Sequence, residues 1–459
     1  FFHIITNNII CFKKIYLFSY LKFSKINFFS LLLALIPISF IAGNMIININ
    51  ILIIIFSVLI LFGKDLLNVK FSILDKIIIF FFFFILGTGI YNDISLYLEH
   101  KSFSVWRGYF STIIKSLLFF KYLFLYLTLK FLVEKNLLNL KYFFISCSLS
   151  SIFVSLDIFL QLVYGKDIFG FEAPSDLRKL GGPFGDELIA GGFIQRFSVF
   201  SFFVIPLFFN KVSKKILIIL IPALFIIFFL GLIFSGNRMP LILFILLICM
   251  IAIFQKQTRK YFFPFLLLFS VTFLLAFNFN DKVKKNFESF YNQISKIVII
   301  AVDQNYDNKN IPQYLKEFAS FYETWRLNKY TGGGIKNFRY YCHVRENIDP
   351  NSKFVCNMHP HNYYLEILTE TGLVGFLTIL SIFSVVLYKS FLKKYIFKNK
   401  FQDNNIIVPF IFLFIIEIFP IKSTGSFFTT GNASYLFLIL AILVALSQKD
   451  NLIDKKNDL

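Results

Sequence analysis

Residues 46–62, IININILIIIFSVLILF, form an apolar run without a charged side chain, and runs of this kind decide the fold. An α-helix needs about 20 mostly apolar residues, with roughly 17–25 as the usual range, to cross a bilayer. The 459-residue chain shares this character, because 57% of its residues are hydrophobic, 16% are charged and the mean hydropathy is +0.71. This composition excludes an ordinary soluble globule, which is about 45–50% apolar and about 25% charged, and it also excludes a disordered chain.

Similar apolar runs recur along the chain, and they lack the alternation of apolar and polar residues that barrel strands require. We therefore predict an all-α polytopic membrane protein of about twelve transmembrane helices. The predicted spans are 27–43, 46–62, 77–91, 109–133, 141–164, 189–209, 215–234, 239–254, 261–279, 362–388, 406–421 and 432–448.

The basic residues predict the orientation of these spans. Lys and Arg outnumber Asp and Glu by 46 to 26, which gives a net charge of +20. A basic excess can indicate nucleic-acid binding, but in polytopic membrane proteins Lys and Arg collect in cytoplasmic loops. Most Lys and Arg residues of the short loops fall on the side that also holds both ends of the chain. We therefore expect cytoplasmic termini, no nucleic-acid partner and, over residues 1–26, a basic tail without a signal-peptide cleavage site.

One long polar segment, residues 280–361, lies between the ninth and tenth predicted spans and by parity faces the periplasm. Long loops in compact proteins are often functional, so we predict a small folded cap, with a passive lid as the alternative. The expected division of the chain is residues 1–279 as bundle spans one to nine, 280–361 as the periplasmic cap, 362–448 as bundle spans ten to twelve and 449–459 as a cytoplasmic tail.

Two of the five cysteines, Cys342 and Cys356, fall in this loop. Because the periplasm is oxidising, we predict that they form a disulfide. His343 and His359 lie close by, but paired ligands at the short spacings of zinc sites are missing, so we predict no metal site.

Several ionisable residues lie at membrane depth in the predicted spans, where such groups are costly and often functional. We expect Lys115 and Asp157, which share a depth, to form an ion pair. Arg196, Arg238 and Glu417 also fall in the outer half. Each of these, taken singly, is equally well explained by a buried structural pair or by snorkelling. Because guanidinium groups bind phosphate oxygens bidentately, the cluster as a whole predicts a site for a polyprenyl-like lipid pyrophosphate.

Residues 359–375, HPHNYYLEILTETGLVG, resemble the C-terminal signature of the O-antigen ligase and polymerase superfamily. That signature is His-Asn, nine residues, Gly, two residues and Gly, and it is met by His361, Asn362, Gly372 and Gly375. The span plan with its long loop is also similar to that of the family. Further stretches that look like parts of the family are 180–186 running on to Arg196, 235–238, 325–339 and 425–432.

The resemblance implies a metal-independent, inverting glycosyltransferase of the membrane-embedded, GT-C-like class that needs neither nucleotide nor cofactor. It implies that His361 acts as the general base on the acceptor hydroxyl, with His359 as an alternative base and helix capping as an alternative role for His361. It also implies that Arg238 and Arg196 hold the pyrophosphate, with Arg178 and Arg339 as weaker candidates.

The function expected from this resemblance is transfer of O-antigen, or a related glycan, from undecaprenyl pyrophosphate to lipid A-core at the periplasmic side of the bacterial inner membrane. A near alternative is a polymerase of O-antigen or surface polysaccharide, for which the acceptor is another lipid-linked unit. An alternative from a different class is a polyprenyl-lipid transporter or flippase that uses the intramembrane charges as its path.

Overall fold

The computed structural model describes residues 24–100, 111–174, 179–209, 214–255, 262–302, 311–343, 355–356, 360–397, 406–422 and 425–457. Over these residues the regular structure is helical, apart from an isolated antiparallel bridge between Lys166 and Glu172. The prediction of an all-α protein is therefore confirmed.

Nine helices in the described part of the chain are long and apolar enough to cross a membrane, which confirms the polytopic class. The first is Ser24–Ala42, and the others lie in α2 (Asn44–Leu67), α3 (Ile73–His100), α4 (Ser111–Glu134), α5 (Leu140–Tyr164), α6 with α7 (Ala190–Phe197 and Val199–Phe208), α8 (Lys214–Phe234), α15 with the π-helical η3 (Tyr363–Leu387 and Tyr388–Phe397) and α17 (Thr430–Asn457).

The other predicted spans also fall on helices. Helix α11 (Phe262–Phe279) with the bent α12 (Asp281–Val302) gives a tenth candidate span. Helices α9 (Arg238–Phe254) and α16 (Val408–Glu417) are apolar but shorter. The exact count of twelve spans therefore stays a prediction.

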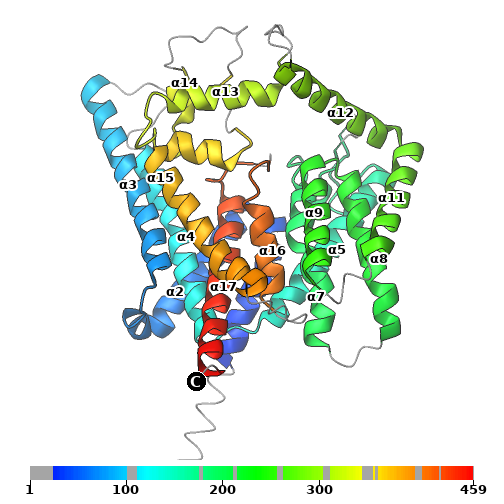
Figure 1. Ribbon diagram of the computed structural model, residues 1–459, viewed down its shortest axis with the longest axis horizontal. Coiled ribbons are helices and arrows are strands. Elements are labelled where there is room, and N and C mark those ends of the chain that lie inside the picture. Colours follow the sequence, from blue (N-terminus) through cyan, green and yellow to red (C-terminus); the bar gives the residue numbers. More distant parts are fainter. Residues whose placement is uncertain are drawn as a thin grey trace, which may run out of the picture.

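Helix α17 lies at the centre of the bundle, beside α4 and α16 (Figure 1). Most of its apolar part is buried, as expected for a helix segment that is apolar on all sides. The ring of Phe437 packs 5.2 Å from that of Phe82 on α3 and 6.2 Å from that of Phe119 on α4. This packing fixes the start of α17, where part of the candidate site lies.

Helix α15 is interrupted at Gly372, whose backbone at φ 64° and ψ −170° is not helical. A continuous helix would pair the N–H of Leu373 with the C=O of Thr369, and the N–H of Val374 with the C=O of Glu370. In this structure all four groups bond instead to the loop that contains residues 329–334. The hydrogen bonds run from Gly333 N to Thr369 O (3.1 Å), Gly334 N to Glu370 O (2.8 Å), Leu373 N to Lys329 O (2.9 Å) and Val374 N to Tyr330 O (3.2 Å).

This exchange explains why the sequence needs glycine at the contact. A Cβ on Gly372 would lie 2.2 Å from the Tyr330 carbonyl oxygen, and one on Gly332 would lie 2.4 Å from the Gly372 nitrogen. Because backbone groups within a bilayer must be satisfied by the protein, the loop and the interrupted helix form one structural unit.

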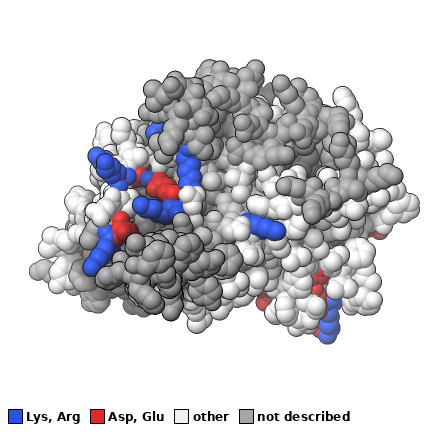
Figure 2. Space-filling model, turned by 90° about the horizontal axis from the view of Figure 1, so that it is seen from below, with Lys and Arg blue, Asp and Glu red and all other residues white. Residues whose placement is uncertain are grey.

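Three helices, α12, α13 (Gln313–Trp325) and α14 (Phe338–His343), form what we call the cap. The cap lies at the end of the molecule opposite the C-terminus (Figure 1). Viewed from the C-terminal end, the described surface carries basic side chains at several places, with acidic ones beside some of them (Figure 2).

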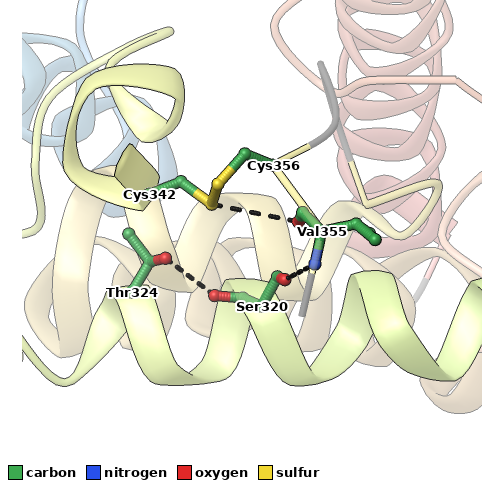
Figure 3. The surroundings of a disulfide bond; sticks show 5 residues. All are labelled: Ser320, Thr324, Cys342, Val355 and Cys356. Carbon is green, nitrogen blue, oxygen red and sulfur yellow. Dashed lines mark hydrogen bonds between the residues drawn. A yellow bond between two sulfur atoms is a disulfide. The ribbon is translucent and has the colours of Figure 1, made fainter. Parts of the chain in front are cut away.

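Within the cap, α13 and α14 share a small core, and a disulfide joins α14 to a later segment of the chain. The rings of Phe321 and Phe338 are stacked in this core. Cys342 of α14 is bonded to Cys356, and next to it the N–H of Val355 donates to Ser320 Oγ of α13 at 2.6 Å (Figure 3). The disulfide therefore ties the segment shortly before His361 to α14, and the hydrogen bond of Val355 ties it to α13.

Candidate active site

His361 lies two residues before the start of α15, with its backbone in the left-handed region at φ 52°. This conformation is uncommon for residues other than glycine and must be held by its surroundings. Asn362 provides that support, because its side-chain oxygen caps α15 by accepting from the N–H groups of Tyr364 (3.0 Å) and Leu365 (3.1 Å). The Asn362 side chain also donates to the carbonyl of Pro420, at 2.8 Å.

The side chain of His361 is half-buried, and its ring centroid lies 5.9 Å from that of Tyr314 on α13. It therefore stands where the cap meets the start of α15. His359, the alternative base, lies outside the described residues.

Arg196, on α6, is largely buried and has four partners from distant parts of the chain. Its guanidinium donates to both carboxylate oxygens of Glu417 (2.8 and 3.2 Å) and to Asn432 Oδ1 (2.6 Å). It also donates to the hydroxyl of Tyr363 (3.4 Å) and lies over the ring of Tyr435. The cluster thus joins α6 to the end of α16 and to the starts of α15 and α17.

Lys422 is the second cation of this cluster, and its side chain is 3% exposed. Its ammonium lies 2.5 Å from Glu417 Oε1, the oxygen that accepts from Arg196 at 2.8 Å, and 3.3 Å from the Tyr363 hydroxyl. Burial lowers the pKa of Lys422 to about 7, and the attraction of Glu417 offsets this only in part. When both cations are protonated, Arg196, Lys422 and Glu417 together carry one net positive charge.

A second polar network connects the same region to the cap. Glu366, one turn into α15, is fully buried and accepts from Lys336 Nζ (3.2 Å) and from the N–H of Phe427 (2.6 Å). Ser426 also bonds to both Glu366 and Lys336. Glu366 therefore links the loop before α17 to α15 and to the loop between α13 and α14 that contains Lys336.

Arg238 begins α9 and points to the cap helix α12. Its guanidinium donates to Asn286 Oδ1 (2.8 Å) and to Gln293 Oε1 (3.2 Å). Both acceptors are uncharged amides, so these two contacts orient the guanidinium without neutralising it. The turn before Arg238 is joined to the start of α6, because Asn237 Oδ1 accepts from the N–H of Gly191 at 3.1 Å.

The other predicted site residues are less closely associated with the polar clusters around Arg196 and Arg238. Arg339 is exposed on α14, and Arg178 lies outside the described residues. The predicted ion pair between Lys115 and Asp157 is wrong, because Asp157 Oδ1 accepts from the Ile168 N–H at 2.8 Å and Oδ2 is buried without a hydrogen-bond partner among the described residues.

The sequence did not predict the site roles of Tyr363, Lys422, Asn432 and the Lys336–Glu366 contact. Signals were present for two of them. Lys422 follows the predicted eleventh span directly, and Asn432 ends the stretch 425–432 that resembles part of the family.

Arg238 and the start of α15 both lie within a segment of the sequence that matches a known protein family. Residues 223–380 match the O-antigen ligase family. The resemblance predicted from the sequence is therefore confirmed over this segment. The matched segment begins within α8 and ends within α15, and so includes Arg238, His361 and Gly372. No curated protein matches the chain significantly.

Proposed function

We propose that the chain moves a glycan from undecaprenyl pyrophosphate to lipid A-core, as an inverting membrane glycosyltransferase. The O-antigen ligase domain supports a membrane enzyme of the glycan ligase and polymerase family. The observation that carries the proposal is the junction at the start of α15. There His361 stands two residues before Tyr363, whose hydroxyl contacts both Arg196 (3.4 Å) and Lys422 (3.3 Å).

In the proposed reaction, the acceptor hydroxyl attacks the anomeric carbon of the lipid-linked glycan. The bond between that carbon and the pyrophosphate oxygen breaks as the new glycosidic bond forms, so the configuration inverts. His361 accepts the proton of the attacking hydroxyl as general base. The electron pair of the broken bond leaves with the pyrophosphate.

The leaving pyrophosphate needs positive charge that is already in place. Arg196 and Lys422 share the single carboxylate of Glu417, so their cluster has one positive charge to offer an anion. Arg238, held by two neutral amides on the neighbouring α12, supplies a further guanidinium. Preorganised cations in a site of low dielectric stabilise developing negative charge strongly.

We further propose an inner-membrane protein with both termini cytoplasmic and the site periplasmic. In this arrangement residues 280–361 form the cap between the bundle segments 1–279 and 362–448, and residues 449–459 form a cytoplasmic tail. The position of the C-terminus at the end opposite the cap supports this arrangement (Figure 1).

The test is transfer in vitro by the purified full-length protein in lipid nanodiscs, with an undecaprenyl-pyrophosphate-linked glycan and lipid A-core. We expect His361→Ala to reduce transfer by about 10²–10⁴-fold, the usual contribution of a general base. Arg238→Ala should also reduce transfer strongly. Arg326→Ala is the matched control, because Arg326 is exposed on the cap and pairs with Glu323 at 2.9 Å. Transfer at the wild-type rate by His361→Ala would overturn the proposal.

The same assay distinguishes the two acceptors. With lipid A-core and a second lipid-linked unit both supplied, a ligase transfers the glycan to lipid A-core. Growth of the lipid-linked glycan instead would identify a polymerase.

A further inference from the structure

Helix α12 leaves the membrane bundle through a sharp bend. Its axis turns by 105° from that of α11, and Asn280 stands at the bend. The Asn280 side chain caps α12 by accepting from the N–H groups of Lys282 and Val283, both at 3.1 Å. Figure 1 shows α12 running obliquely from the end of α11 toward α13.

The helix is amphipathic along its whole length. With 3.6 residues per turn, Val283, Phe287, Ile294 and Val298 fall on one face, which we call the apolar stripe. Asn292 falls on the opposite face, together with Lys285 and Lys296 among others.

The two halves of the apolar stripe have different surroundings. In the first half, Val283 is 5% exposed and the Phe287 ring packs 5.0 Å from that of Phe273 on α11. In the second half the stripe continues without cover, with Ile294 44% and Val298 56% exposed. The exposed half therefore points to the same side as the half that packs on the membrane bundle.

The location and the charge of α12 indicate which molecules cover the exposed half of the apolar stripe. The helix begins where the apolar α11 ends, so its start lies at the depth of the lipid headgroups if α11 spans the bilayer. It also carries four lysines against two acidic residues, which suits an anionic headgroup region. Amphipathic helices of this composition lie in the plane of the interface with their apolar face in the acyl region.

We infer that α12 is an interfacial helix whose exposed half-stripe, Ile294 with Val298, is covered by acyl chains of the outer leaflet. The inference rests on the membrane topology and not on the proposed chemistry. It has a consequence for the site, because Asn286 and Gln293 of the same helix hold Arg238. Lipid contact would thus fix the height of that guanidinium relative to the headgroups.

The test uses tryptophan fluorescence of the full-length protein in vesicles of phosphatidylcholine and phosphatidylglycerol. The two native tryptophans, Trp106 and Trp325, are replaced by phenylalanine, and one tryptophan is introduced as Ile294→Trp or, as the matched control, Asn292→Trp. We expect acyl chains brominated near the headgroup to quench Ile294→Trp at least twofold more than Asn292→Trp, with blue-shifted emission. Equal quenching at both positions, or none at either, would overturn the inference.

A second measurement is used if the variant without the two native tryptophans does not purify as folded protein. There the same two substitutions are made in the wild-type chain, and quenching is taken from the difference in emission with and without the introduced tryptophan. The same contrast between positions 294 and 292 supports or overturns the inference.

Discussion

At the scale of single residues, Gly372 is the position at which the structure most clearly requires glycine. Its φ of 64° is strained for any residue with a Cβ, and that atom would lie 2.2 Å from the carbonyl oxygen of Tyr330. We predict that Gly372→Ala destabilises the protein by more than about 2 kcal/mol, because neither backbone can move without losing hydrogen bonds. The measurement is the apparent Tm of the purified protein in detergent.

Gly192→Ala is the control for this prediction. A Cβ on Gly192 would meet nothing within 4 Å, and the residue lies in helix α6 with ordinary backbone angles. Alanine favours helix over glycine, so the apparent Tm should stay the same or rise. An unchanged Tm in Gly372→Ala would show that the loop and helix are not locked together.

Lys422 gives a prediction on pH dependence. Because its pKa is lowered to about 7, the ammonium loses its charge as the pH rises through about 7. If the charge binds the donor pyrophosphate, kcat/KM for the donor should fall on the alkaline side with an apparent pKa near or above 7. Lys422→Arg should remove this alkaline limb, since a guanidinium stays protonated. A limb that persists in Lys422→Arg would exclude Lys422 as its source.

The sequence shows which residues are out of place in a membrane, but not with which residues they pair. Arg196 is identified from its depth in a predicted span, yet its partner Glu417 is 221 positions away. Lys115 and Asp157 share a predicted depth but face different surroundings, because depth along a helix says nothing about the direction of a side chain. Pairing depends on helix rotation and packing, which a single sequence does not report.

At the scale of elements, the disulfide of the cap can be tested directly. We predict that Cys342 and Cys356 resist maleimide in denaturant until reductant is added, whereas Cys147 and Cys249, which are free, react without it. Mass spectrometry of the labelled peptides makes the measurement. Labelling of Cys342 and Cys356 without reductant would contradict the pairing.

Removing the bond should loosen the cap and leave the bundle intact. The disulfide closes a loop of 14 positions, for which chain entropy predicts about 3 kcal/mol. Cys342→Ser with Cys356→Ser should therefore become sensitive to limited proteolysis between α14 and α15, while Cys249→Ser should not.

The positions of helices are largely predictable, because hydrophobicity is a local property of the sequence. In the part of the chain that the structure describes, the segment 46–62 and its counterparts fall on helices. Interruptions are less predictable, since they depend on distant partners. Residues 189–209 contain one candidate span, as predicted, whereas the break at Gly372 was not predicted and exists because residues 329–334 replace its hydrogen bonds.

At the scale of the whole molecule, the proposed ligase makes a prediction for cells. Deletion of the gene should leave lipid A-core without a glycan ladder on a lipopolysaccharide gel, and long lipid-linked glycan should accumulate because its acceptor step is lost. A wild-type copy should restore the ladder, and a His361→Ala copy expressed to the same level should not. Lipopolysaccharide that carries a single repeat unit would instead indicate loss of a polymerase.

The contact between α15 and residues 329–334 limits how this molecule can be altered by evolution or by design. A cap from a related protein cannot simply be grafted between α11 and α15, because removing the native loop would take away the present hydrogen-bond partners of four main-chain groups at the break in α15. Chimeras should therefore tolerate exchange or lengthening of the cap upstream of Lys329, and fail when a junction separates that loop from the helix it completes. The two segments would be inherited together.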